Sequence, residues 1–312
     1  MSYYLGIDGG GTKTTAVVGD ETRVLARATA GPSNIVRVGA EQARISLEQC
    51  VRQACAGAGI VPEQISHTCV GAAGAARPEL ADVVRKILSE VVAGPIGVVG
   101  DMETALEAAF GQGPGVVVNA GTGSFAYGGD SQGNTARAGG WGFAIGDEGS
   151  AHWIGRMTVS ALLRDADEDP GVADSAFARA LEKAWGVSSL LDLARAANAV
   201  PPPDFAALFP VVAASAEKIA HDVLAKAGRE LARVAEIVIR RLFADGPGRV
   251  PVARSGGVFR HAAIVGDIFY NELRRMEPRA EVSREIVDPV DGALRMARRG
   301  GFSAASQKRE LG

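Results

Sequence analysis

The sequence predicts an α/β protein built from two related halves, and two observations lead to this prediction. Short apolar runs typical of strands alternate with amphipathic helical segments from the N-terminus to about residue 110. This alternation is the pattern of helices layered on a sheet. A strand–glycine turn–strand motif then occurs twice, at Leu5–Val18 and at Gly115–Gly129. The recurrence indicates a duplicated domain plan with a cleft between the halves.

The first half is expected to open with a hairpin, because Leu5 and Ile7 precede three adjacent glycines and β-forming threonines and valines follow them. The other elements of this half are expected as a strand at 23–28, a helix at 41–57, a strand at 65–71, a helix at 79–92, a strand at 95–100 and a helix after Asp101.

The second half is expected to repeat the hairpin and then to become mainly helical from Ser150 onward. Its helices are expected at 150–163, 174–185, 188–198 and 205–209, and from 211 to about 243 with an interruption near Gly228. A strand at 250–253 leads into a third glycine turn, RSGGVFR, which opens a helix, and DPVDGALRMARR closes the chain as a turn followed by a helix.

Composition describes an ordinary soluble globular chain of 312 residues, 47% hydrophobic and 22% charged, with a net charge of −3. The mild acidity gives no electrostatic reason to expect nucleic acid or an anionic membrane as a partner. No secretory signal pattern and no apolar run near 20 residues is seen, so a cytoplasmic protein is expected. The three cysteines, Cys50, Cys55 and Cys69, lack the spacing of a disulfide framework or a zinc site.

The first glycine turn differs from two familiar phosphate-binding loops. A Walker loop requires Gly-Lys-Ser/Thr before a helix, whereas here Gly11 is followed by Thr12 and then by a strand. The dinucleotide fingerprint fails because Thr14 stands where its last glycine is required. What remains is a strand–glycine turn–strand with Asp8 at the end of the first strand. A tight hairpin with an incidental aspartate is the alternative.

The paired glycine turns fit a nucleotide whose phosphates are bound by backbone N–H groups and by the hydroxyls of Thr12 and Thr122. A Mg²⁺ ion would bridge the phosphates, and Asp8 is the natural carboxylate for it, through water, because magnesium keeps much of its hydration. Lys13 either neutralises phosphate or points outward along its strand, and both interpretations stay open.

Asp101 stands at the end of a predicted strand, directly before a helix. This position favours an N-cap, a common role of aspartate. The functional alternative is a general base that accepts the proton of an attacking hydroxyl. The two roles are compatible, but only the second predicts a loss of turnover on substitution.

A sugar-binding segment is suggested near Asp147, which lies with Glu148 between two glycines ahead of a helix. Helix capping is the alternative for these acids. Trp141, Gly142 and Trp153 crowd into the same stretch, and sugar sites typically combine carboxylates with apolar surface and close backbone. Asn34 is by default a turn former and could also serve as a hydroxyl partner.

Six segments occur in a characteristic order: LGIDGGGTKT, VVGDMETAL, VVNAGTGS, GGWGFAIGDEGSAHWIG, AEKIAHDVLAKAG and SGGVFR. Together they resemble the N-acetylglucosamine kinase branch of the sugar kinase/actin/heat-shock ATPase superfamily. This branch includes bacterial glucosamine and N-acetylmuramate kinases. It overlaps with the BadF/BadG/BcrA/BcrD-type ATPases that activate benzoyl-CoA reductase and hydroxyacyl-CoA dehydratases. The resemblance covers almost the whole chain.

The resemblance implies two ribonuclease H-like domains with an actin-like ATPase fold, at residues 1–114 and 115–312, the second with a helical insertion at about 150–248. It implies ATP- and Mg²⁺-dependent phosphorylation of the 6-hydroxyl of an amino sugar, with N-acetylglucosamine first and N-acetylmuramate or glucosamine as alternatives. An activator ATPase is disfavoured because no cysteine lies near the glycine turns after residue 100. The resemblance also implies a homodimer.

Residue roles follow from the resemblance position by position. Asp101 matches the catalytic base, and Phe125 stands where the family often has a polar residue. The sugar-site positions are Asn34, Asp101, Ser124, Phe125, Gly140, Trp141, Gly142 and Asp147. The nucleotide-site positions are Gly10, Gly11, Thr12, Lys13, Gly121, Thr122, Gly123, Gly256 and Gly257.

Overall fold

The computed structural model describes residues 2–75, 77–244, 246 and 248–300. Contacts divide the chain into unit 1, Met1–Gly113 together with Val287–Gly312, and unit 2, Pro114–Ile286. The first boundary falls one residue from the predicted position. The C-terminal segment differs from the prediction, which assigned it to the second domain, because helix α11 (Pro289–Arg299) packs within unit 1.

Unit 1 contains a five-stranded sheet in the order β3-β2-β1-β4-β5. The strands are β1 (Tyr3–Gly9), β2 (Thr14–Gly19), β3 (Val24–Ala30), β4 (Ile65–Ala72) and β5 (Ile96–Gly100). β1, β2 and β3 pair antiparallel, whereas β4 and β5 run parallel to β1. The predicted hairpin and all of the predicted strands of this half are therefore present.

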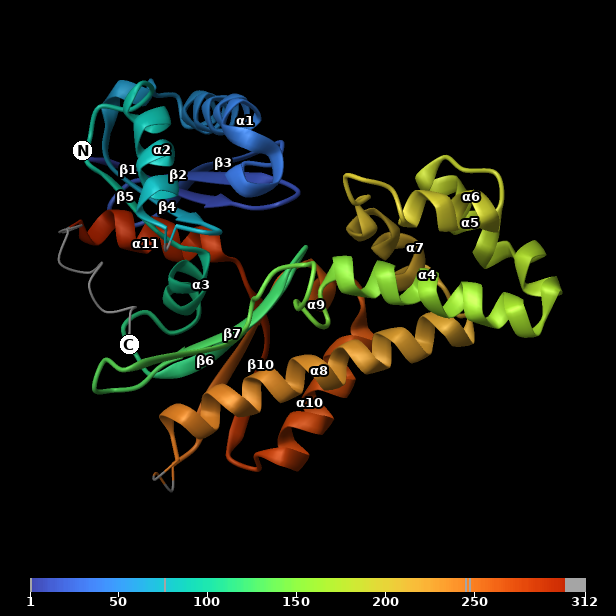
Figure 1. Ribbon diagram of the computed structural model, residues 1–312. Coiled ribbons are helices and arrows are strands. Elements are labelled where there is room, and N and C mark those ends of the chain that lie inside the picture. Colours follow the sequence, from blue (N-terminus) through green and yellow to red (C-terminus); the bar gives the residue numbers. More distant parts are fainter. Residues whose placement is uncertain (1, 76, 245, 247, 301–312) are drawn as a thin grey trace. The chain divides into compact units, whose positions relative to one another are not determined.

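Helices cover both faces of this sheet (Figure 1). α1 (Ile35–Gly57) and α2 (Pro78–Ser89) pack on one face, over Leu5 and Ile7. α3 (Asp101–Phe110) and α11 pack on the other face, where Tyr4 contacts α11. Because side chains alternate along a strand, Asp8 lies on the α3/α11 face. α1 starts six residues before the predicted helix and contains non-helical Gly39.

Three glycines let α3 and α11 lie close to the sheet and to each other. A Cβ on Gly6 would lie 2.4 Å from the Leu294 nitrogen and 2.9 Å from the Val290 oxygen. A Cβ on Gly71 would lie 2.4 Å from Thr104 Oγ1, and one on Gly292 would lie 2.0 Å from the Thr104 oxygen. Only glycine permits these approaches, and they hold the first turn of α11 over β1, beside Asp8.

The two helices are also joined by an ion pair. Glu107 of α3 is only 6% exposed, and its carboxylate oxygens accept hydrogen bonds of 2.5 and 2.7 Å from the Arg299 guanidinium of α11. Removing one partner from such a pair would leave an uncompensated buried charge. This ion pair therefore fixes α11 in its position against α3.

Unit 2 repeats the sheet, in the order β10-β9-β6-β7-β8. The strands are β6 (Gly115–Ala120), β7 (Ser124–Gly129), β8 (Thr135–Gly139), β9 (Val250–Ser255) and β10 (Ala280–Val287). β6, β7 and β8 form the antiparallel meander, and β9 runs parallel to β6, as in unit 1. This recurrence confirms the duplicated α/β plan. The sequence analysis missed β10, an edge strand whose residues are mostly exposed or half-buried.

Helix α8 (Lys218–Leu242) packs against this sheet, and α10 (Ala263–Met276) packs against α8 (Figure 1). The interruption predicted near Gly228 is wrong, because α8 is continuous there. A Cβ on Gly228 would lie 2.8 Å from the Val265 oxygen, so this glycine serves close helix packing. The break lies earlier, between α7 (Phe209–Ala214) and α8.

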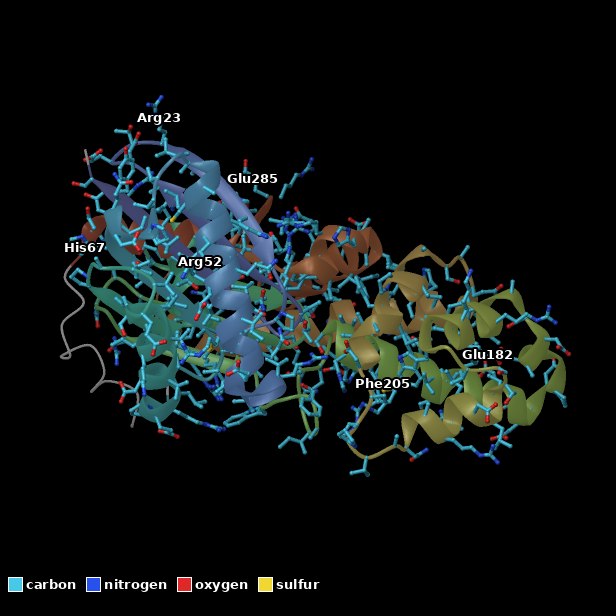
Figure 2. All side chains as sticks on the ribbon, turned by 90° about the horizontal axis from the view of Figure 1, so that it is seen from above. Arg23, Arg52, His67, Glu182, Phe205 and Glu285 are labelled. Carbon is cyan, nitrogen blue, oxygen red and sulfur yellow. The ribbon has the colours of Figure 1, made fainter. Side chains whose placement is uncertain are left out.

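The predicted helical region of unit 2 is present. Its elements are α4 (Ala151–Glu168), η2 (Pro170–Asp174), α5 (Ala176–Trp185), α6 (Leu190–Ala197) and η3 (Phe205–Leu208), followed by α7. Phe205, labelled with Glu182 in Figure 2, is almost buried and its ring lies 5.0 Å from that of Trp185 and 5.2 Å from that of His152. These contacts fix the helical region to α4. Across the described ranges, no helix is both long and apolar enough to cross a membrane.

The three cysteines are free and buried in unit 1, so they form no disulfide, as the sequence predicts. Burial raises the pKa of Cys50 and of Cys55 to about 11, which keeps both thiols protonated at neutral pH. They are core residues of α1.

Candidate active site

The β1–β2 turn of unit 1 is tied to the segment before α1. The Gly10 N–H donates to the Lys13 carbonyl oxygen at 3.0 Å, which closes the turn. The Gly10 carbonyl in turn accepts the N–H groups of Ser33 and Asn34 at 3.2 and 3.3 Å. Thr12 and Lys13 are exposed at the tip. The turn is thus a braced loop whose tip points to solvent.

Asp8 is the second-to-last residue of β1, just before this turn, and is half-buried. Removal from water raises the pKa of its carboxyl to about 7, and the nearby carboxylates of Asp101 and Asp288 raise it further, against the opposing effect of Lys13. Three acids therefore gather at one edge of the unit 1 sheet. Sequence reasoning missed Asp288, whose only local signal is an Asp-Pro pair before a helix.

Asp101 is the first residue of α3, and Gly100 is the N-cap. The Gly100 N–H donates to Glu103 Oε1 at 2.9 Å, so Glu103 makes the capping contact. The N-cap interpretation that sequence position favoured for Asp101 is therefore wrong. Asp101 Oδ1 accepts the Met102 N–H at 3.1 Å, and the side chain is half-buried. Asp101 therefore stands in the first turn of α3 without serving as its cap.

Asp288 is the N-cap of α11, and its Oδ1 accepts the Val290 N–H at 3.4 Å. The Arg27 guanidinium of β3 bridges Asp288, at 2.6 Å, and Asp291, at 2.8 Å. These contacts fix the start of α11 beside Asp8. Asp288 is thereby both a helix cap and the third member of the acidic group.

The acidic edge fits a magnesium ion held through water. The neighbouring carboxylates repel one another, and a divalent cation would offset that repulsion. Within the described part of the chain, no three His, Cys, Asp or Glu side chains are close enough to bind a metal directly. Magnesium commonly retains several waters and uses one or two carboxylates, and Asp8 as the carboxylate for it stays a prediction.

Asn34 caps α1, its Oδ1 accepting the Val36 N–H at 3.1 Å. Its backbone N–H bonds to Gly10, so Asn34 lies next to the β1–β2 turn. The structure thus brings together within unit 1 the predicted residues Gly10, Gly11, Thr12, Lys13, Asn34, Asp8 and Asp101.

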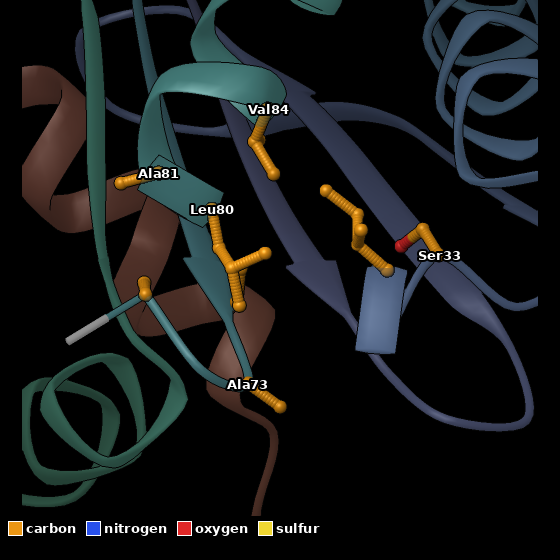
Figure 3. Close-up of a pocket in the computed structure, with 8 residues that line it drawn as sticks. Ser33, Ala73, Leu80, Ala81 and Val84 are labelled. Carbon is orange, nitrogen blue, oxygen red and sulfur yellow. The ribbon is translucent and has the colours of Figure 1, made fainter. Parts of the chain in front are cut away.

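A small cavity lies close to Asn34, between the segment before α1 and the loop that leads from β4 into α2 (Figure 3). Ser33 lines one side, and Ala73, Leu80, Ala81 and Val84 line the other. Its volume of about 10 Å³ admits no more than a water molecule. It is a packing gap and not a sugar site.

The β6–β7 turn of unit 2 is braced in a similar way. The Gly121 N–H donates to the Gly123 carbonyl at 2.9 Å. The N–H groups of Ala151 and His152, in the first turn of α4, donate to the carbonyls of Gly121 at 2.8 Å and Thr122 at 3.4 Å. The predicted phosphate-binding turn is therefore held by the start of α4.

Asp147 joins this turn to the predicted sugar segment. It is 8% exposed, and its φ of 58° is unusual for a residue other than glycine. Its Oδ1 accepts the Gly142 N–H at 3.0 Å, and its Oδ2 lies 2.7 Å from where a Cβ on Gly123 would be. Burial raises the pKa of Asp147, while Gly142 and Arg137 oppose the rise. The helix-cap alternative fails, because Ser150 caps α4.

Ser124 and Phe125 support this segment from below. The Ser124 hydroxyl donates to the Glu148 carbonyl at 2.7 Å, and both side chains are almost buried. A Cβ on Gly140 would lie 3.2 Å from the Phe125 Cβ, so the Phe125 side chain starts directly beside Gly140. Phe125 offers no hydrogen bond where the family often has a polar residue.

The segment from Gly140 to Gly146 presents apolar side chains to solvent. Trp141 is 69% exposed and Ile145 is 81% exposed. Phe143 is anchored, since its ring lies 5.0 Å from that of His152. We call this segment, with Asp147, the sugar loop, after the role that the sequence predicts for it.

The third glycine turn lies beside the second. Gly256 has a φ of 99°, and a Cβ there would lie 2.3 Å from the Ala120 oxygen. The β9–α9 turn, where α9 spans Gly257–His261, is therefore pressed against the residue before Gly121. Unit 2 thus brings together the predicted residues Gly121, Thr122, Gly123, Ser124, Phe125, Gly140, Trp141, Gly142, Asp147, Gly256 and Gly257.

Comparison with known families agrees with these features. The model of the BadF/BadG/BcrA/BcrD ATPase family matches residues 5–297. The chain belongs to this family. The resemblance noted from its sequence segments is thereby confirmed at the family level.

Two curated relatives of this BadF/BadG/BcrA/BcrD ATPase family member match along almost their full length. The N-acetylmuramic acid/N-acetylglucosamine kinase of Clostridium acetobutylicum is 30% identical over 96% of this chain and 99% of its own. The N-acetyl-D-glucosamine kinase of Dictyostelium discoideum is 28% identical over 94% and 97%. A crystal structure from Chromobacterium violaceum, assigned as an N-acetylglucosamine kinase, has a TM-score of 0.72 and 26% identity, covering 94% of this chain and 98% of that one. These likenesses confirm the predicted fold class.

Proposed function

We propose that this protein is an ATP-dependent kinase that phosphorylates the 6-hydroxyl of an amino sugar, with N-acetylglucosamine as the first candidate. N-acetylmuramate and glucosamine are the alternatives. The observation that carries the proposal is Asp101, a half-buried carboxylate that does not cap its helix and lies beside Asp8. Family membership and the similarity to amino-sugar kinases support it.

Asp101 is the general base in this proposal. Phosphoryl transfer needs the acceptor hydroxyl oriented and its proton accepted as the bond to phosphorus forms. A carboxylate at the start of a helix that is packed rigidly through Gly71 and Gly292 meets the need for a fixed position.

The glycine turns at Gly10–Lys13 and Gly121–Gly123 bind phosphate in this proposal, through backbone N–H groups and the hydroxyls of Thr12 and Thr122. Lys13, exposed at the tip of its turn, supplies a positive charge. A Mg²⁺ ion held by Asp8 through water would neutralise charge on the phosphates when it is bound. Gly256 and Gly257 underlie the nucleoside.

The sugar loop and Asn34 bind the acceptor in this proposal. Asp147 is already oriented by Gly142, so its carboxylate can accept a sugar hydroxyl without reorganising. Trp141, largely exposed, offers the apolar face on which a sugar ring packs. The homodimer that the resemblance implies stays a prediction.

A substrate panel tests the proposal. The protein is incubated with ATP, Mg²⁺ and, separately, N-acetylglucosamine, N-acetylmuramate, glucosamine and glucose, and phosphorus–proton NMR locates the phosphate in each product. N-acetylglucosamine 6-phosphate is expected. Phosphate at the anomeric hydroxyl, or no sugar phosphate from any member of the panel, would overturn the proposal.

A further inference from the structure

Arg137 lies in β8, opposite Tyr127 of β7, two residues before the strand ends at the sugar loop. Its guanidinium carbon lies 4.7 Å from the centre of the Trp141 ring, so the cation is stacked on the largest exposed side chain of the loop. The Arg241 guanidinium donates to the Arg137 carbonyl at 2.7 Å and fixes this part of the strand. These two contacts therefore fix both the backbone and the guanidinium of Arg137.

Among the residues that the structure describes, no ion pair neutralises the charge of Arg137. Its side chain forms no salt bridge with any carboxylate that the structure describes. Other arginines of unit 2 do pair with carboxylates: Arg179, Arg195, Arg240, Arg249, Arg275 and Arg279. Arg137 is half-buried, so its charge is less screened by solvent than a fully exposed one would be.

The cation lies close enough to the sugar loop to act on it. Its charge acts on the Asp147 carboxyl, lowering that group's pKa against the effect of burial. Asp147 and Trp141 are the two groups that the proposed function assigns to the acceptor. A planar cation fixed beside both is placed at the rim of the acceptor site.

We infer that Arg137 is a specificity-determining residue that binds a carboxylate substituent carried by the acceptor sugar. The inference rests on the proposed function and adds that the acceptor site takes amino sugars that bear a carboxylate as well as neutral ones. A guanidinium recognises a carboxylate through two parallel N–H···O bonds. An arginine already stacked on an aromatic ring loses little further side-chain freedom when it forms them.

A purely positioning role predicts a different outcome. If Arg137 only holds Trp141 in place, its loss would impair every acceptor that packs on Trp141 to the same degree. If it binds a carboxylate, the loss depends on whether the acceptor carries one. Neutral and acidic acceptors that share one sugar ring therefore separate the two roles.

The test compares three acceptors: N-acetylglucosamine, N-acetylmuramate, which adds a lactyl carboxylate, and the methyl ester of N-acetylmuramate. We expect Arg137→Gln to lower kcat/KM for N-acetylmuramate roughly 10–100-fold, through KM. N-acetylglucosamine and the ester, which carry no carboxylate, should lose clearly less activity than N-acetylmuramate, and both by about the same factor. Arg137→Lys, which keeps the charge, should retain part of the activity with N-acetylmuramate. Arg240→Gln removes a charge from an exposed ion pair on α8 and serves as the matched control.

Three results would overturn the inference: equal losses for all three acceptors, no loss for N-acetylmuramate, or a wild-type protein that phosphorylates N-acetylglucosamine but not N-acetylmuramate. In each of these cases the proposed kinase activity would stand. Absence of phosphorylation of every sugar would instead overturn the proposed function, and this inference with it.

Discussion

The two glycine hairpins share one backbone plan but differ in charge. Asp8 precedes the first turn, whereas Asn119 takes the equivalent place in β6, one residue before the strand ends at Ala120. The first turn is closed by Gly10 and Lys13 and the second by Gly121 and Gly123. Unit 1 thus has a carboxylate at the strand position where unit 2 has an amide.

The difference extends to the surroundings of each turn. Around the first, Asp101 and Asp288 begin two helices that are packed through glycines onto the sheet. Around the second, Asp147 is an almost buried acid beside an exposed apolar loop. The two units share one scaffold. In the proposed function, the residues at the turns and helix starts give the metal and proton chemistry to unit 1 and the sugar surface to unit 2.

The largest effect is expected at the proposed base. Asp101→Asn should lower kcat by about 10²–10⁴-fold, because the amide cannot accept the hydroxyl proton. Thermal unfolding and ATP binding should stay near wild type, since Asp101 does not cap α3. Kinetics with the best sugar of the panel, alongside calorimetric ATP binding, provide the check. Near-normal turnover would remove Asp101 from the mechanism.

The second-largest effect is expected when Asp8 and Asn119, the residues that differ between the two turns, are each replaced by the other type. Asp8→Asn should raise the Mg²⁺ concentration needed for half-maximal activity by roughly 10–100-fold, because a carboxylate is lost from the ion's surroundings. Asn119→Asp adds a charge next to the second turn and should weaken ATP binding instead. A Mg²⁺ titration of both variants, read by ATP binding as well as by activity, compares them. If both variants changed the Mg²⁺ requirement and ATP binding in the same way, the proposal that only the first turn serves the metal ion would be contradicted.

A smaller effect, on stability alone, is expected where α3 and α11 meet. Gly292→Ala would place a Cβ 2.0 Å from the Thr104 oxygen, and overpacking of this kind costs about 1–3 kcal/mol of unfolding free energy. Gly248→Ala, whose Cβ would meet nothing within 4 Å, is the control. Urea unfolding measures both. Equal stability of the two variants would show that the close approach is not needed.

The smallest effect concerns pH. Burial raises the pKa of Asp147, so the folded state binds its proton more tightly than the unfolded state does. The carboxylate therefore destabilises the fold as the pH rises from its ordinary value of 3.8 through the raised value. The Asp147→Asn variant should have a higher melting temperature than the wild type at pH 8. This difference in melting temperature should become smaller as the pH falls toward 4. A constant difference across this range would contradict the assignment.

The sequence predicted both hairpins because glycine runs and β-branched residues act locally. It missed β10, whose charged residues suit an exposed edge but break the apolar alternation expected of a strand. It misread Gly228 as a break because a glycine required for contact with α10 looks, along the chain, like any other helix glycine.

The candidate site was predictable only in part. Asp101 could not be distinguished from a cap, because N-cap and first helical residue differ by a single position. Asp288 was missed because its proximity to Asp8 depends on α11 returning to the first sheet from the end of the chain. Arg137 carries no motif, and only the fold stacks it on Trp141.

The fate of the γ-phosphate of ATP tests the central claim, that a unit 1 carboxylate prepares a sugar hydroxyl for attack. ATP labelled in that phosphate is followed with and without N-acetylglucosamine, and sugar phosphate and inorganic phosphate are separated and counted. The account predicts that ADP and sugar phosphate form in equal amounts and that inorganic phosphate stays at background. Release of inorganic phosphate at the same rate whether or not the sugar is present would contradict it.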